Sequence, residues 1–377
     1  MSVHALKSQF PTIRVRGTPA ERGRQLGQQA RRQIQHNIEL YSELFRHYAG
    51  WDWRRATNYA ASFRQPIAEY EPRYLAEIEG IAAGAGVAVE DILALNVRTE
   101  IMFAAVASQA AHGGGPARFA RECTAFALLP AATADGHTLI GQNWDWHPRM
   151  RETLVVLHAQ QDSGPDYVTV VEAGLLAKMG FNSAGIGLAA NALISDRDRG
   201  EAGVPFHVVL RGLLDAETMT QALAAINRQP RAASANYLVA HRDGEAFNAE
   251  TAPGDYTRVY ADFVAGDMLV HTNHFTSPRF DLHDVGLWNG PDSPFRYTRL
   301  THLLRTAAGG LNVARLQTTL ADHFNRPHSI CRHPDPAAPA AEQYATIASV
   351  IMDLTAGTMW LADGNPCEVE YREVGIL

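Results

Sequence analysis

Apolar residues recur with helical spacing through the first hundred residues of the chain. The segment TPAERGRQLG places Thr18 three residues before Glu21 with a proline between them, which is the pattern of a capping box at a helix start. The helical period then continues to about residue 106, interrupted by two prolines, and Gly84 and Gly86 form a helix stop signal. We therefore expect a mostly helical N-terminal segment.

The pattern changes to strand-like alternation after the glycine-rich segment HGGGPA. Asp135-Gly136 and Asp243-Gly244 are hairpin signals, each between two apolar runs. The expected strands lie at 123–129, 137–145, 152–160, 166–174, 185–193, 233–250 and 267–274, and a C-terminal meander covers 346–373. Helical periodicity returns at 205–228 and 295–323. Hairpins with helices inserted between them predict an α+β fold of antiparallel sheets covered by helices.

Composition narrows the class of protein. The chain has 377 residues, of which 46% are hydrophobic and 19% charged, and it has no apolar run long enough for a membrane span. Its net charge of -7 argues against binding to nucleic acid. No secretory signal is visible in MSVHALKSQF, so the expected location is the cytoplasm, and the three cysteines are expected to be free thiols.

Several polar residues stand where a core residue is expected. Cys123 opens a strand-like run, and the base rate for such a cysteine favours a small core hydrophobe. Asp145 ends the next strand, in GQNWDW, where it must find water or a partner. Asn273 lies in VHTNHF, and Arg332 follows a short apolar pair in HSICRH. Each of these signals alone is weak.

Taken in order, these strings resemble a known family. CTAF, GQNWDW, EAGLLAKMGFNSAGIGL, AASANYLVA, VHTNH and SICR resemble the isopenicillin N acyltransferase family of N-terminal nucleophile hydrolases, and GTPAERGRQLG and LNVRTE extend the likeness over almost the whole chain. The resemblance implies a four-layer αββα sandwich that is made as a precursor and cuts itself before Cys123. It implies one globular unit formed by a helical segment 1–122 and a catalytic segment 123–377.

The implied chemistry is hydrolysis of a linear amide or transfer of its acyl group to an amine. A terminal Cys123 could use its own α-amino group, with a reference pKa of about 7.7 to 8.0, as the base for its thiol, and a thioester would follow. By the resemblance, Asp145 orients that amine, Arg332 favours the thiolate or neutralises Asp145, and Asn273 stabilises the oxyanion. Asn191 is a further oxyanion candidate through a looser likeness to bile-salt hydrolases and penicillin V acylases.

The cleavage site would be the bond between Glu122 and Cys123. Residues 113–115 are glycines, which supply backbone freedom for bending the scissile peptide. The chain departs from the acyltransferase by carrying Glu in place of Gly before the cysteine, and that carboxylate could act as a local base or hinder thiolate formation.

We expect aromatic residues to bind the substrate. The candidates are Trp144, Trp146, Phe181 and Phe275, although each of them could equally be an ordinary core residue. The expected partner is a small acyl amide or an amine acceptor, with acyl-coenzyme A as a candidate co-substrate. We expect no resident cofactor or metal and no membrane or nucleic-acid partner.

Three alternatives remain. A metal hydrolase could use the pair His271 and His274 or the series His323, His328 and His333, but these spacings lack a paired i, i+4 arrangement. A papain-like protease fits poorly because CTAF lacks the local cysteine signature of that family. The third alternative is a catalytically silent relative that binds a small ligand. The presence of Cys123 together with Asp145, Asn273 and Arg332 argues against it.

Overall fold

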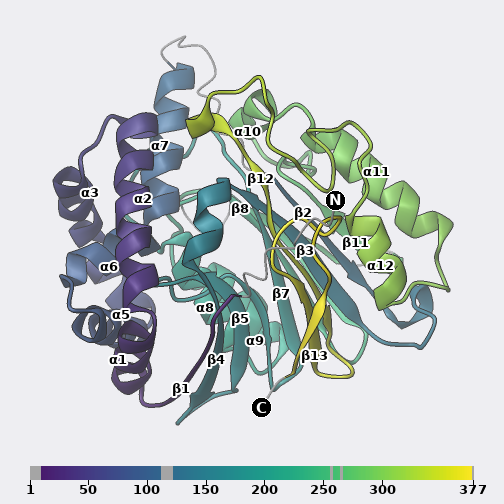
Figure 1. The fold of residues 1–377 in the computed structure, drawn as a ribbon, viewed down its shortest axis with the longest axis horizontal. Helices are drawn as coiled ribbons and strands as arrows, with labels where there is room; N and C mark the ends of the chain where they lie inside the picture. The colour runs from purple at the N-terminus through teal and green to yellow at the C-terminus, as the bar shows by residue number, and fades with distance from the viewer. Residues whose placement is uncertain (1–9, 112–121, 255–257, 264–265, 376–377) are drawn as a thin grey trace, which may run out of the picture.

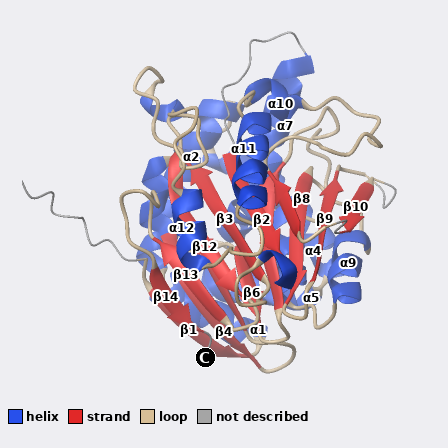
Figure 2. Ribbon diagram, turned by 90° about the vertical axis from the view of Figure 1, so that its right-hand side faces the viewer, coloured by secondary structure: helices blue, strands red, loops and turns tan. Residues whose placement is uncertain are grey.

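A computed structural model describes residues 10–111, 122–254, 258–263 and 266–375. Two β-sheets lie face to face at the centre of the molecule, and helices cover both outer faces (Figure 1). The predicted four-layer αββα architecture is confirmed. Figure 2, turned by 90°, shows the strands (red) with helices (blue) in front of them and around them.

The larger sheet has eight strands in the order β1-β4-β5-β6-β7-β8-β9-β10. Its neighbouring strands pair antiparallel except β1 and β4, which are parallel. The strands are β1 (Thr12–Gly17), β4 (Leu154–Gln161), β5 (Tyr167–Glu172), β6 (Met179–Asn182), β7 (Ile186–Ala192), β8 (Ala235–His241), β9 (Glu245–Thr251) and β10 (Val259–Phe263).

The smaller sheet has six antiparallel strands in the order β11-β2-β3-β12-β13-β14. They are β2 (Glu122–Leu128), β3 (Leu139–Trp146), β11 (Met268–His271), β12 (Ala345–Asp353), β13 (Thr358–Ala362) and β14 (Arg372–Gly375). Both predicted hairpins form, β2–β3 and β8–β9, and the glycine of each turn has a positive φ. Strands β2 and β3 pack on β7 of the other sheet.

The helical layer on the larger sheet comes mostly from the N-terminal segment. These helices are α1 (Pro19–Gln29), α2 (Arg31–Ala49), α3 (Trp53–Ala60), α4 (Arg64–Tyr70), α5 (Pro72–Ala85), α6 (Val89–Asn96) and α7 (Arg98–Ala111), joined by α8 (Phe206–Leu214) and α9 (Met219–Asn227). The capping box at Thr18 is confirmed, since Thr18 and Glu21 exchange both hydrogen bonds.

Two details of the N-terminal segment differ from the prediction. Residues 12–17 form β1, whose Ile13 and Val15 are buried while Arg14 and Arg16 face solvent. Gly84 does not end a helix: it lies inside α5, where a Cβ would meet the carbonyl oxygen of Arg24 at 2.2 Å, so it lets α1 and α5 pack closely. The helix ends at Gly86, which adopts the left-handed conformation.

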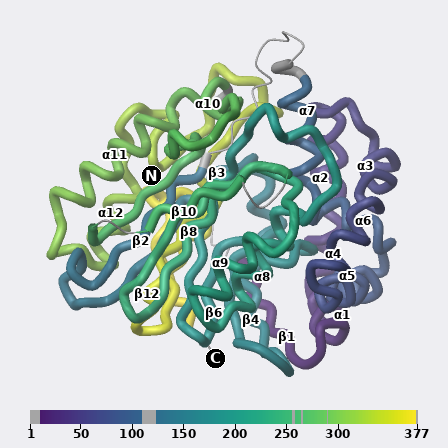
Figure 3. Tube along the Cα trace, turned by 180° about the vertical axis from the view of Figure 1, so that it is seen from behind, coloured from purple at the N-terminus to yellow at the C-terminus, as the bar shows by residue number. Residues whose placement is uncertain are grey.

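The helical layer on the smaller sheet lies on the opposite side of the molecule (Figure 3). It contains α10 (Val285–Asn289), α11 (Ser293–Thr306) and α12 (Val313–Leu320). Helix α11 contacts β2 and β11, and α12 contacts β12. Leu300, Leu304 and Leu316 join Phe126 of β2 in a separate apolar cluster on this face. This packing brings α11 against the strand that carries Cys123.

Candidate functional site

Cys123 lies in the second position of β2, the strand next to the edge strand β11 of the smaller sheet. It pairs with Trp144 of β3, and only 4% of its surface is exposed. The preceding residue, Glu122, continues the same regular ladder opposite Asp145. The predicted cleavage site is therefore a strand peptide in this structure, while residues 113–115 lie outside the described part of the chain.

Side chains from three elements hold the backbone of Cys123. Its N–H donates to Oδ1 of Asn273 at 2.6 Å. Its carbonyl oxygen accepts from Nδ2 of Asn191 at 3.1 Å and from Nη1 of Arg296 at 3.0 Å. The structure thus brings the predicted Asn273 and Asn191 to Cys123. It adds Arg296, which sequence reasoning missed.

Arg296 projects from α11 and is almost fully buried. Besides the Cys123 carbonyl, its guanidinium donates to Oγ1 of Thr124 at 2.9 Å and to Oδ1 of Asn273 at 3.2 Å. Its Nε donates to Oδ2 of Asp292 at 2.8 Å. The planar guanidinium of Arg296 therefore fixes β2, Asn273 and the start of α11 relative to each other.

Asp145 lies at the end of β3 and is 1% exposed. Its Oδ1 accepts a hydrogen bond from Thr346 at 2.6 Å. Its Oδ2 is 3.9 Å from Nε of Arg332 and accepts no hydrogen bond from the described residues. Burial raises the pKa of Asp145 well above its ordinary value, against the opposing effects of Arg296 and the Thr346 hydrogen bond. One carboxylate oxygen beside the nucleophile is thus left for a further donor.

Arg332 joins this cluster from the loop between α12 and β12. Its Nη2 donates to the same Asp292 oxygen as Arg296, at 2.8 Å, and its backbone N–H donates to Thr346 at 2.9 Å. Burial lowers the pKa of Arg332 to about 9, so the guanidinium stays charged at neutral pH. Arg332 therefore lies against Asp145, as one of its two predicted roles requires, and is linked to Arg296 through Asp292.

Asn273 has a different set of contacts from the one predicted. Its Oδ1 faces the Cys123 N–H, and its Nδ2 donates to the carbonyl oxygen of Ala192 at 3.0 Å. The backbone N–H of the uncut Cys123 thus has Asn273 as its partner, and the role of Asp145 toward the α-amine of a cut chain stays a prediction. The oxyanion role of Asn273 stays a prediction.

A small cavity of about 20 Å³ adjoins Cys123, room for about one water molecule. Its walls are formed by Arg98, Thr99, Cys123, Trp144, Asp145, Trp146, Lys178, Ala192 and Phe206. Trp144 and Trp146 are where the prediction placed them. Phe181 and Phe275 do not line this cavity: Phe181 is buried within β6, and Phe275 makes an edge-to-face contact with Phe280, with ring centres 4.9 Å apart. Their role in substrate binding stays a prediction.

Lys178 is one of the charged residues that line this cavity. Its ammonium lies 5.3 Å from the ring centre of Trp144 and 4.8 Å from that of Phe206. Burial raises the pKa of the Cys123 thiol, Lys178 acts to lower it, and Asp145 acts to raise it further. The ammonium is therefore the nearby charge that favours a thiolate.

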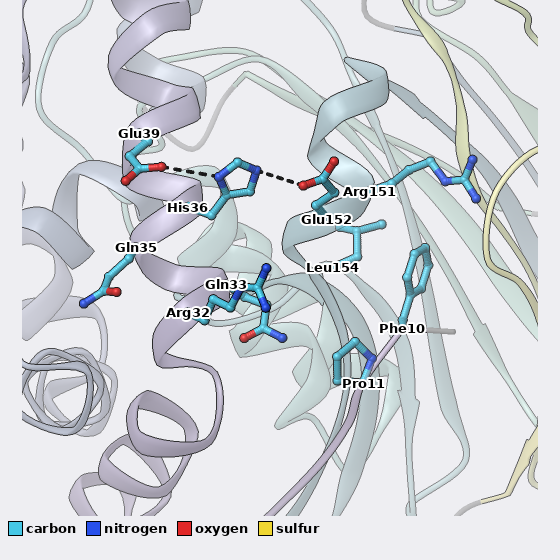
Figure 4. Close-up of a pocket in the computed structure, with 10 residues that line it drawn as sticks. All are labelled: Phe10, Pro11, Arg32, Gln33, Gln35, His36, Glu39, Arg151, Glu152 and Leu154. Atoms are coloured by element: carbon cyan, nitrogen blue, oxygen red, sulfur yellow. Dashed lines mark hydrogen bonds and ion pairs between the residues drawn. The ribbon is translucent and has the colours of Figure 1, made fainter. Parts of the chain in front are cut away.

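A larger surface hollow lies between α2 and the short helix η3 (Pro148–Thr153) (Figure 4). In this hollow, Nδ1 of His36 is 3.4 Å from a Glu39 oxygen and its Nε2 is 3.3 Å from a Glu152 oxygen. This surface hollow shares no lining residue with the cavity beside Cys123. We assign no chemistry to it.

The histidines that were considered as metal ligands do not all lie together, and each has its own contacts. His271 binds Glu250 at 2.7 Å, and His274 binds Ser293 at 2.8 Å. Nδ1 of His328 is 2.7 Å from Nη1 of Arg332. His323 and His333 do meet, with their Nε2 atoms 3.1 Å apart, but beside two cysteines and not beside Cys123.

Comparison with known proteins places this chain in a family. The family described as "AAT: Acyl-coenzyme A:6-aminopenicillanic acid acyl-transferase" matches residues 132–368. The chain belongs to this family. The acyltransferase family member is also 31% identical, over 325 residues, to the "Acyl-coenzyme A:6-aminopenicillanic-acid-acyltransferase 40 kDa form" of Emericella nidulans, covering 85% of this chain and 84% of the relative.

Solved structures similar to this acyltransferase family member are more distant. A mutant form of conjugated bile acid hydrolase from Clostridium perfringens matches with a TM-score of 0.43 and 13% identity, over 68% of this chain and 97% of that one. Penicillin V acylase from Agrobacterium tumefaciens matches with a TM-score of 0.39 and 13% identity, over 64% of this chain and 83% of that one.

By its family, the chain is thus an enzyme of the acyltransferase class. Across the described residues, none of the helices combines the length and the apolar character that a membrane span requires.

Proposed function

We propose that this protein is a self-processing cysteine amidohydrolase or acyltransferase whose nucleophile is Cys123. The observation that carries the proposal is the convergence on one strand residue of two asparagines, an arginine and a carboxylate with one oxygen free of hydrogen bonds from the described residues. The pairing of β2 with β11 ends at Ala125, so these side chains take the place of a neighbouring strand at Cys123. The family supports the same chemistry.

Maturation would begin with the Cys123 thiolate attacking the carbonyl carbon of Glu122. The carbon–nitrogen bond of that peptide breaks, the Cys123 nitrogen takes up the proton, and a thioester joins Glu122 to the Cys123 sulfur. Water then hydrolyses this thioester, which leaves a carboxylate on Glu122 and a free thiol and amine on Cys123. Asn191 and Arg296 hold the Cys123 carbonyl throughout, so the strand keeps its register.

Turnover would use the amine that maturation releases. The amine accepts the thiol proton, the sulfur attacks the amide carbonyl of the substrate, and the leaving amine takes that proton as the tetrahedral intermediate collapses. The acyl group then sits on Cys123 as a thioester until water or an amine acceptor removes it. The name of the curated relative supports acyl-coenzyme A as a donor, since its thioester could load the same sulfur.

The geometry suggests how the new amine would be held. A peptide nitrogen has one hydrogen, and Oδ1 of Asn273 already accepts it at 2.6 Å. A terminal ammonium has three, and Asp145, which also lines the cavity, has an oxygen free of hydrogen bonds from the described residues. We therefore assign Asp145 as the orienting acid of the cut form, where Arg296 and the Thr346 hydrogen bond oppose the rise in its pKa that burial causes.

The two segments should stay together after the cut. Strand β1 of the N-terminal segment pairs with β4 over six residues. Arg98 and Tyr41 both bind the buried Glu172, at 2.7 and 2.5 Å. Segments 1–122 and 123–377 are therefore expected to elute as one species in gel filtration and to separate only in denaturant.

Intact-mass analysis tests the proposal. Wild type should give two polypeptides, 1–122 and 123–377, and Cys123→Ala should give one uncut chain. Cys123→Ser is the matched variant, since its hydroxyl can still attack but is a weaker nucleophile, so it should be cut slowly. A wild type that stays whole while hydrolysing a panel of acyl anilides, or a Cys123→Ala variant that retains this activity, would refute the proposal.

A further inference from the structure

The other two cysteines of the chain lie together, away from the nucleophile. Cys331 is in the loop between α12 and β12, and Cys367 is in the turn between β13 and β14. Their sulfur atoms are 3.5 Å apart. His323, just after α12, and His333, two residues after Cys331, complete a group of four. Four side chains from two distant stretches of sequence thus aim one ligand atom each at the same point.

The spacing of these atoms matches a tetrahedral metal site. Zinc bonds of about 2.3 Å to sulfur and about 2.0 Å to nitrogen place tetrahedral ligand atoms roughly 3.3 to 3.8 Å apart. The two histidine Nε2 atoms are 3.1 Å apart. The Nε2 of His333 is 3.7 Å from the sulfur of Cys331 and 3.3 Å from that of Cys367, and all four ligand atoms lie within 4.8 Å of one another.

The surroundings also suit a metal. Cys331 is fully buried, while His323 and Cys367 are exposed, so an ion can enter from solvent. The amide of Asn365 approaches the Cys331 sulfur at 3.6 Å, and the Nδ1 of His333 is 3.7 Å from a Glu368 oxygen. A donor toward a thiolate and a carboxylate behind a histidine are the outer contacts found around protein metal sites.

We propose that His323, Cys331, His333 and Cys367 bind a structural zinc ion. Both thiols lose their protons on binding, both imidazoles bind as neutral rings, and all four positions are occupied by protein. Two thiolates and two imidazoles favour zinc over calcium or magnesium, which take oxygen ligands. A site closed by four protein ligands holds structure and leaves no position for a substrate.

The ion would stiffen the loop that carries Arg332. Arg332 lies between two of the ligands in sequence, and its carbonyl oxygen accepts from Nδ2 of Asn365 at 2.6 Å. The zinc would tie this loop to the turn that contains Cys367, and so hold Arg332 against Asp145 and Asp292. Figure 2 shows α12 in front of β12 and β13, where these segments meet.

Metal analysis of the full-length protein tests the site. After gel filtration in metal-free buffer under reducing conditions, wild type should hold about one zinc per chain. Cys367→Ser and His323→Ala should lose it, and because both residues are exposed, these variants should keep the wild-type circular dichroism spectrum. His302→Ala, at an exposed histidine on α11, is the matched control and should keep the metal. Cys123→Ala should keep it too, so this result is independent of the proposed catalysis.

Cobalt(II) gives a second readout. Metal-free wild type titrated with cobalt should develop the thiolate-to-cobalt charge-transfer absorption and the strong visible bands of a tetrahedral site, and Cys367→Ser should lose the charge-transfer intensity. Wild type without zinc that also fails to take up cobalt would overturn the proposal. A disulfide between Cys331 and Cys367 that accounts for both thiols in freshly isolated protein would overturn it as well.

Discussion

Replacement of Arg296 by Met removes the guanidinium group that holds β2 at Cys123. The substitution keeps the length and apolar stem of the side chain and deletes the donors to Cys123, Thr124 and Asn273. It also removes one of the two cations on Asp292. We expect loss of stability together with slow maturation, because Asn273 and the Cys123 carbonyl lose the group that aligns them.

The magnitude follows from burial. Removing one partner of a buried ion pair costs about 3 to 5 kcal/mol, because the charge that remains is uncompensated. Asp292 keeps Arg332 at 2.8 Å, so the cost should lie near the lower end, about 3 kcal/mol. For a chain of 377 residues, with an unfolding entropy of about 2.1 cal/mol/K per residue, this lowers Tm by about 4 °C.

Arg299→Met is the matched control on the same helix. Arg299 pairs with Asp322 at 2.6 Å but is 34% exposed, and such surface pairs contribute about 0 to 1 kcal/mol. Differential scanning calorimetry and the time course of chain cleavage by intact mass would be recorded for both variants. Equal melting temperatures and equal cleavage rates for Arg296→Met and Arg299→Met would refute the assignment of Arg296 as the residue that positions the site.

Two further predictions concern the thiol and the helix packing. In Lys178→Met, the rise of activity that accompanies thiolate formation should shift to higher pH, because the ammonium of Lys178 lowers the pKa of the Cys123 thiol. Lys178→Arg should leave this part of the pH profile in place. An unshifted profile for Lys178→Met would contradict the assignment. Gly84→Ala should destabilise the fold by about 1 to 3 kcal/mol, measured by denaturant unfolding, because its Cβ would meet the α1 backbone at 2.2 Å. Gly375→Ala, with nothing within 4 Å, should be close to neutral, and equal losses in the two variants would refute the packing argument.

Local patterns in the sequence were sufficient for most of the architecture. The alternation around Asp135-Gly136 and Asp243-Gly244 predicted both hairpins, and the capping box at Thr18 predicted the start of α1. Strand β1 was missed although Ile13 and Val15 alternate with arginines, because six residues before a strong helix signal give little pattern. Its pairing with β4 depends on tertiary contact.

The site could be predicted only where a residue is unusual for its position. Cys123 and Asp145 stand out because a thiol and a carboxylate occupy strand positions, and the structure brings them to one cavity. Arg296 gave no signal, since an arginine in an amphipathic helix is ordinarily solvent-exposed. The sequence likewise does not show that Cys331 and Cys367 group with two histidines, because Cys367 lies in a turn 34 residues after His333 and only the fold brings the two together.

The proposed function depends on the amine released at Cys123, which acts as the base for its own thiol. Its most direct test is to isolate freshly made wild-type chain, let it mature, and measure anilide hydrolysis at each time against the fraction of chain cut between Glu122 and Cys123. Activity should rise in proportion to the cut fraction and extrapolate to zero for the uncut chain. Full activity in samples that intact mass shows to be uncut would contradict the account.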